Sequence, residues 1–90
     1  MNNMTIEKTK YKHINFVESE NQELIYAGKK GWEIKNNRTK SLLGYIFWFT
    51  KWGEYCFTQA DSGVIFNDGC LKDIVDFMGQ LKILTPTRDK

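Results

Sequence analysis

Residues 43–57 of the chain read LGYIFWFTKWGEYCF, and seven of these fifteen residues are aromatic. Two runs rich in β-forming residues, 41–50 and 54–60, flank a short segment that contains Trp52 and Gly53. This pattern predicts a β-hairpin. Because side chains alternate between the two faces of a strand, the hairpin must carry aromatic residues on both sides of its sheet.

The length of the loop decides which aromatic residues share a face. A loop of two or four residues gathers four large apolar side chains on one face: Ile46, Trp48, Tyr55 and Phe57. A three-residue loop places Phe47 and Phe49 there instead. We favour the even loop because it separates Glu54 and Thr58 from the apolar set, and we expect Gly44 to leave room for a helix on that face.

Other runs of β-forming residues predict strands at 11–17, 32–36 and, as a short last strand, 64–67. Residues 23–27 fit a short strand or a helical turn equally well. The remaining element is a helix over residues 68–84, with Asn67 as its N-cap and Asp68 in its first turn.

Seven apolar residues of this helix recur at helical spacing: Cys70, Leu71, Ile74, Val75, Phe77, Met78 and Leu81. Such a stripe needs an apolar surface to cover, and one face of an antiparallel sheet provides it. The sequence therefore predicts an α+β fold with an antiparallel sheet of four to five strands and one C-terminal amphipathic helix packed on one face. We expect a single domain, 1–90, with flexible tails at 1–10 and 85–90.

The cysteine content indicates the redox environment. Cys56 and Cys70 are too few for a disulfide-rich secreted module, and the N-terminus lacks the apolar segment of a signal peptide. The longest apolar run is far shorter than the ~20 residues of a membrane span. We therefore expect both thiols to be free, no association with a membrane, and a reducing cytoplasm as the location.

Few residues suit catalysis or metal binding. His13 is the only histidine, so the paired ligand motifs of zinc sites are absent from the sequence. Cys70 lies near a helix N-terminus, where a thiol can become reactive, but its place in the apolar stripe favours a role in the core. The sequence predicts a protein that is not an enzyme and that uses no metal or cofactor.

The second face of the hairpin carries five residues that the C-terminal helix would leave uncovered: Leu43, Tyr45, Phe47, Phe49 and Cys56. An exposed aromatic patch usually marks an interface. The alternative is that an N-terminal segment covers this face with its own apolar residues, which are Ile14, Phe16, Leu24, Ile25 and Tyr26. The sequence leaves both interpretations open.

Several short matches carry a resemblance to a known family: Trp32-Glu33, Leu43-Gly44-Tyr45-Ile46, Trp48, Trp52, Tyr55 with Phe57, Phe66, Cys70-Leu71, Asp73-Ile74 and Phe77. Their spacing resembles that of a family of small uncharacterised proteins from bacteriophages and prophages. The resemblance covers residues 32–81 and implies no assigned activity. The chain has Gly53 where that family often has an arginine, and it lacks a proline that often follows the second strand. A role of that arginine or that proline therefore cannot be assigned to this chain.

The resemblance implies that the protein acts in the cytoplasm of a bacterial host cell. Small phage proteins often occupy the surface of a host protein, so we predict an inhibitor or adaptor that binds a host bacterial protein, such as a component of a defence system. The predicted partner-binding residues lie on the second face and the hairpin turn: Tyr45, Phe47, Phe49, Lys51 and Trp52.

Two alternatives remain. Residues 28–40 contain five basic residues against one Glu, although the net charge of the chain is only +2. A nucleic acid or nucleotide would contact the basic segment and the hairpin turn through six residues: Lys29, Lys30, Arg38, Lys40, Lys51 and Trp52. The alternative interpretation of these lysines is structural: they lie in a solvated loop and on an edge strand, where their charge prevents pairing with other chains. The other alternative is a structural homodimer through the exposed sheet face.

Overall fold

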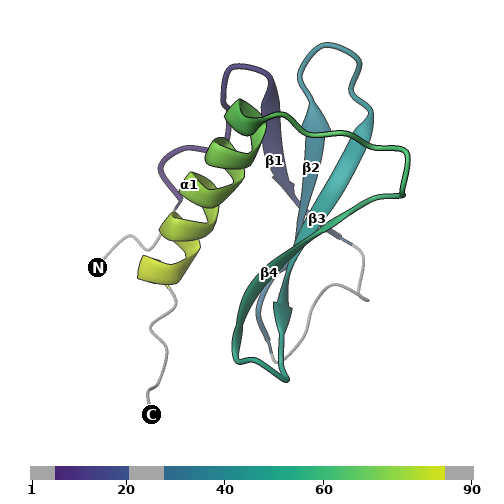
Figure 1. Cartoon of the computed structure of the whole chain (residues 1–90). Coiled ribbons are helices and arrows are strands. Elements are labelled where there is room, and N and C mark those ends of the chain that lie inside the picture. The colour runs from purple at the N-terminus through teal and green to yellow at the C-terminus, as the bar shows by residue number, and fades with distance from the viewer. Residues whose placement is uncertain (1–5, 21–27, 85–90) are drawn as a thin grey trace.

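The computed structural model describes residues 6–20 and 28–84, which form one antiparallel sheet and one helix (Figure 1). The elements in chain order are β1 (Ile14–Glu18), β2 (Trp32–Asn36), β3 (Leu42–Phe49), β4 (Glu54–Gln59) and α1 (Asp68–Leu84). Among the described residues the strands lie in the order β1-β2-β3-β4, so β1 and β4 are the edges of this sheet. The predicted α+β fold is confirmed with four strands, and residues 23–27 lie outside the described residues.

The register of the central hairpin confirms the even loop. Phe49 pairs with Glu54 across a four-residue turn, and Trp48 pairs with Tyr55. The two paired rings meet edge to face, with 5.4 Å between their centroids. Gly53 ends the turn with φ of 67°, a left-handed conformation that glycine adopts without steric cost.

The core lies between α1 and the face of the sheet that we call the inner face. Its buried residues are Tyr11, Ile14, Phe16, Trp32, Ile34, Ile46, Ile74, Phe77 and Leu81. Phe77 is central: its ring stacks on Phe16 with 4.0 Å between centroids and meets Trp32 edge to face at 5.1 Å. Ile14 and Phe16 therefore lie under the helix and do not cover the second face, whereas the predicted covering residues 24–26 lie outside the described residues.

Residues 6–10, which we expected to belong to a flexible tail, are attached to α1. The backbone N–H groups of Glu7 and Lys8 donate to Gln80 Oε1 at 3.1 and 3.0 Å. Next to them, the Tyr11 hydroxyl donates to Asp76 at 2.7 Å. Burial, and then the hydrogen bond to Asp76, raise the pKa of Tyr11, so its hydroxyl stays protonated and keeps donating.

Asn67 caps α1 as the sequence predicts. Its side-chain Oδ1 accepts a hydrogen bond from the Cys70 N–H at 2.8 Å, and its carbonyl accepts the first helical bond, from Leu71, at 3.0 Å. We expect Asn67→Ala to lower the free energy of unfolding by about 1 kcal/mol, because one N–H of the first turn loses its partner. Urea denaturation measures the loss, and Asn67→Asp, which keeps the acceptor, is the control. A loss of equal size in both variants would contradict the capping role.

The predicted strand at 64–67 is wrong. This segment links β4 to α1 outside the sheet, with Ile65 almost fully exposed. The side-chain amide of Gln59 donates to the carbonyls of Asp61 and Val64 at 2.9 and 3.0 Å, which turns the chain away from the sheet. Of this segment, Phe66 packs against the core, and its ring meets Phe57 edge to face.

Two expectations about β3 are also wrong. The pairing of β2 with β3 shifts between Ile34 and Lys35, which skips Leu43 and lets its side chain pack against the core. Gly44 does not make room for the helix. A Cβ at Gly44 would lie 2.6 Å from the backbone oxygen of Thr58, so the close neighbour is β4.

Candidate functional site

The outer face of the sheet, opposite α1, carries a chain of three aromatic rings at the end of the β3–β4 hairpin. We call Phe47, Phe49 and Trp52 the hairpin cluster. Phe47 meets Phe49 edge to face at 6.1 Å, and Phe49 meets Trp52 in the same way at 4.9 Å. Trp52 keeps 66% of its surface exposed in spite of this contact. The turn therefore presents an indole ring to solvent while the rings behind it hold it in place.

The other two predicted partner-binding residues flank the hairpin cluster. Lys51 is exposed in the turn, directly before Trp52. Tyr45 is half-buried further along β3, where it pairs with Glu33 on one side and Thr58 on the other. The fold thus places all five predicted residues along β3 and its turn, with Trp52 as the most exposed of the four aromatic residues.

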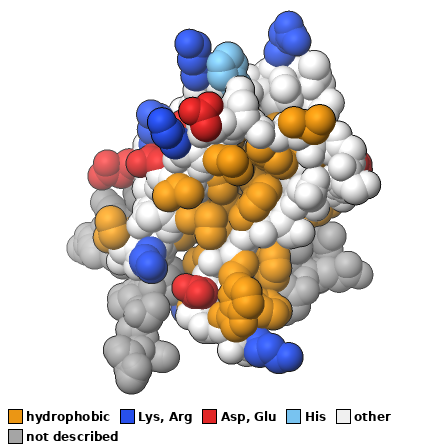
Figure 2. Space-filling view, viewed as in Figure 1, with side chains coloured by type: hydrophobic (Ala, Val, Ile, Leu, Met, Phe, Trp, Pro, Cys, Tyr) orange, Lys and Arg blue, Asp and Glu red, His pale blue; other side chains and the backbone are white. Residues whose placement is uncertain are grey.

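The basic residues of the nucleic-acid alternative do not form one surface. Arg38 and Lys40 lie in the β2–β3 turn, whereas Lys29 and Lys30 precede β2, and Lys51 lies in the β3–β4 turn at that same end of the sheet. The eight residues of β3 separate the two ends by roughly 25 Å. Figure 2 likewise shows basic side chains gathered at the top of the molecule and another at its lower end.

Several of these basic groups already have partners within the chain. Lys30 forms an ion pair with Glu18 at 3.2 Å, and Lys40 donates to the carbonyl of Asn37 at 3.0 Å. The ammonium group of Lys29 lies 5.0 Å from the centre of the Trp48 ring, within cation–π distance. These contacts tie three of the basic side chains to the fold itself.

The residues considered for catalysis are not brought together. His13 is exposed beside the β2–β3 turn, where its carbonyl accepts from the Asn37 N–H. Cys56 pairs with Phe47 near the other end of the sheet, and burial, with the nearby Glu54, raises the pKa of its thiol. Both cysteines are free. Within residues 6–20 and 28–84, no three side chains of the metal-binding types form a group.

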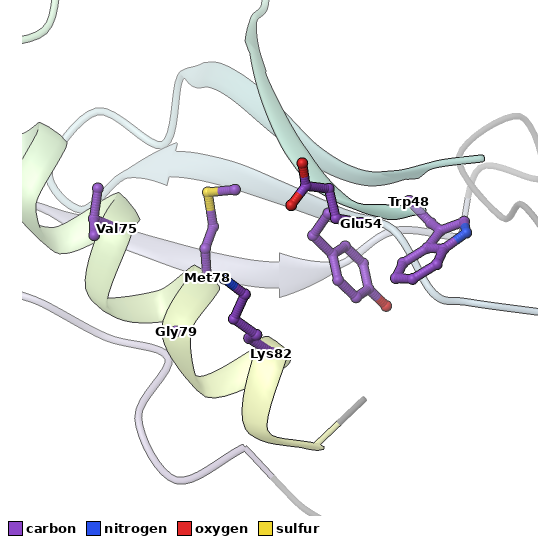
Figure 3. Close-up of a pocket in the computed structure, with 7 residues that line it drawn as sticks. Trp48, Glu54, Val75, Met78, Gly79 and Lys82 are labelled. Carbon is purple, nitrogen blue, oxygen red and sulfur yellow. The ribbon is translucent and has the colours of Figure 1, made fainter. Parts of the chain in front are cut away.

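A second surface, which the sequence did not predict, lies on the inner face at the same end of the hairpin. Trp48, Glu54 and Tyr55 form one wall of a groove of about 270 Å³, and α1 forms the other (Figure 3). Val75 lines the helical wall with 68% of its surface exposed, although the apolar stripe predicted a buried position. The apolar stripe of α1 is wider than the part of the helix that packs on the core. This excess width was the signal in the sequence from which a second apolar surface could have been predicted.

The described part of the chain thus defines a small α+β protein with apolar surfaces on both faces of its central hairpin. None of its described helices is long and apolar enough to cross a bilayer. No protein-family model, curated protein or solved structure matches the chain. The resemblance to small phage proteins therefore stays a prediction.

Proposed function

We propose that this chain is a non-enzymatic binding protein that attaches to another protein through the hairpin cluster and Lys51. The observation that carries the proposal is the position of Trp52, which lies at the tip of a turn with most of its ring in water. Exposed tryptophan surface is costly in water, and a tight turn needs no indole to form. A partner that buries the ring is the simplest reason for its place there.

The surroundings of Trp52 suit an interface anchor. Tryptophan contributes a large contact area and has few side-chain rotations to lose on binding. The edge contact with Phe49 limits those rotations before the partner arrives, which reduces the entropic cost of association. Lys51 adds an exposed positive charge that attracts an acidic patch during the encounter.

The partner we propose is a protein of a bacterial host, such as a component of a defence system, met in the host cytoplasm. This part of the proposal rests on the resemblance to small phage and prophage proteins. The wide separation of Arg38 and Lys40 from Lys51 and Trp52 favours a protein partner over a nucleic acid, because a bound strand would have to reach both ends of the sheet.

Affinity purification of the tagged protein from bacterial cells, followed by native mass spectrometry, tests the proposal. We expect a bound host protein with the native chain, and with Trp52→Ala we expect about 30-fold weaker binding of that protein, as for a central interface tryptophan. Ile65→Ala is the matched control, since it removes an exposed apolar side chain outside the hairpin.

Equal recovery of the bound protein with Trp52→Ala and Ile65→Ala would overturn the role of the hairpin cluster. A homodimer that Trp52→Ala dissociates would replace the host protein with a second copy of the chain. Recovery of nucleic acid that falls steeply with added salt would instead favour the basic residues.

A further inference from the structure

We infer that the groove between β4 and α1 binds an extended peptide segment of a partner protein, which adds to β4 as a fifth strand and inserts one apolar side chain between the hairpin and the helix. This inference does not rest on the proposed function. The groove lies on the inner face, and none of its lining residues belongs to the hairpin cluster.

Within the described sheet, the backbone of β4 directs hydrogen-bonding groups away from β3, toward the outer edge. Ala60 donates its N–H to the Leu43 carbonyl, so the alternation of an antiparallel ladder turns the backbone groups of Phe57 and Gln59 away from β3. Among the described residues no strand lies beyond β4. An open edge of this kind is the usual template for an added strand.

The side walls of the groove suit one apolar side chain of such a strand. Trp48 and Tyr55 form an aromatic corner with their rings at 83° to each other. Opposite them α1 offers Val75 and Met78, and the flexible thioether of methionine adapts to ligands of different shape. Figure 2 shows hydrophobic side chains gathered across the region between α1 and β4, so this surface continues beyond the groove itself.

Two opposite charges flank the apolar walls. Figure 3 shows Glu54 on the hairpin side and Lys82 reaching along the groove from the last turn of α1. Neither side chain forms an ion pair within the described part of the chain. The preferred peptide therefore carries an apolar residue with an acidic group toward Lys82 and a basic group toward Glu54.

An extended peptide fits these features better than a compact ligand. The open backbone of β4 supplies hydrogen bonds only to another backbone or to a group that imitates one, and strand addition uses them together with a side-chain pocket. With a volume of about 270 Å³, the groove accommodates one large side chain and leaves the rest of the peptide along the strand edge.

Selection from a display library of random ten-residue peptides, with the whole protein as bait, tests the inference. We expect enriched peptides that share an apolar residue between an acidic and a basic one. Their affinity should fall about tenfold or more with Val75→Arg, which places a long charged side chain in the groove. Ile83→Arg is the matched control on an exposed position of α1 outside the groove, where affinity should change by less than about twofold.

A second variant guards against loss of the fold. Gly79 lines the groove, and a Cβ added there meets no atom within 4 Å, so in Gly79→Leu the first carbon of the leucine side chain fits without a clash and the rest extends from a groove-lining position. Leucine also favours the helix over glycine. Gly79→Leu should weaken binding as Val75→Arg does. Hydrogen exchange supplies an independent readout, since the backbone N–H groups of Phe57 and Gln59 should become protected only when peptide is bound.

Three results would overturn the inference. They are the absence of any enriched peptide, equal enrichment on Val75→Arg and on the native chain, and binding that leaves the exchange of the Phe57 and Gln59 amides unchanged. A concentration-dependent dimer that Val75→Arg dissociates would assign the groove to a second copy of this chain, in place of a partner peptide.

Discussion

Phe77→Ala is expected to lower the free energy of unfolding by about 3–5 kcal/mol, the usual cost of truncating a buried phenylalanine. Phe77 has 0% of its surface exposed. Its ring lies flat on Phe16 from β1 and forms a T-shaped contact with Trp32 from β2, so one side chain of α1 contacts two strands. Alanine leaves a cavity between three rigid elements, which cannot collapse without moving the helix.

The magnitude decides the outcome, because a domain of 90 residues has a total stability of only about 5–13 kcal/mol. Phe77→Ala therefore removes roughly a quarter of it or more. Urea denaturation followed by circular dichroism measures the change. Val75→Ala is the matched control two residues away, exposed at 68%, and should shift stability by less than about 0.5 kcal/mol. Similar losses in both variants would mean that α1 does not close the core through Phe77.

The sequence predicted the parts of the fold that depend on local chemistry. Asn67 was recognisable as the cap because asparagine is a preferred N-cap residue, whose side chain accepts a hydrogen bond from an N–H of the first turn. The bond from the Cys70 N–H to Asn67 confirms this prediction. The hairpin register followed from the need to keep Glu54 out of the apolar set, and the pairing of Phe49 with Glu54 agrees with it. The same register places Trp52 in the turn, so its position was predictable, although the extent of its exposure was not.

Contacts between distant residues were beyond the reach of the sequence. The bond from Tyr11 to Asp76 joins groups 65 positions apart, and nothing near Tyr11 indicates it. The basic residues 29–40 looked like one patch because they are close in sequence, but β2 lies between their two halves and separates them. Val75 belonged to a regular apolar stripe, and only the placement of the sheet decides which part of that stripe is buried.

Gly44→Ala is expected to destabilise the protein by about 2–3 kcal/mol, at the upper end of the cost of overpacking. The new methyl group would lie 2.6 Å from the carbonyl oxygen of Thr58 and 3.0 Å from the ring of Phe57. The oxygen belongs to the backbone of β4, so relief requires the strand to move and not merely a side chain. That movement would disturb the pairing of Ile46 with Phe57, where β4 meets the buried core.

Gly79→Ala gives the opposite sign and so separates the steric effect from the general effect of replacing glycine. At Gly79 the methyl group meets nothing within 4 Å, and alanine in the interior of a helix is expected to stabilise the protein by about 0.5–1 kcal/mol. Thermal denaturation of both variants measures the difference. If Gly44→Ala were neutral, β4 would have to lie further from β3 than its pairing indicates, and the open edge on which the peptide groove depends would be misplaced. The sign of the Gly44 result therefore tests the framework of the groove independently of any ligand.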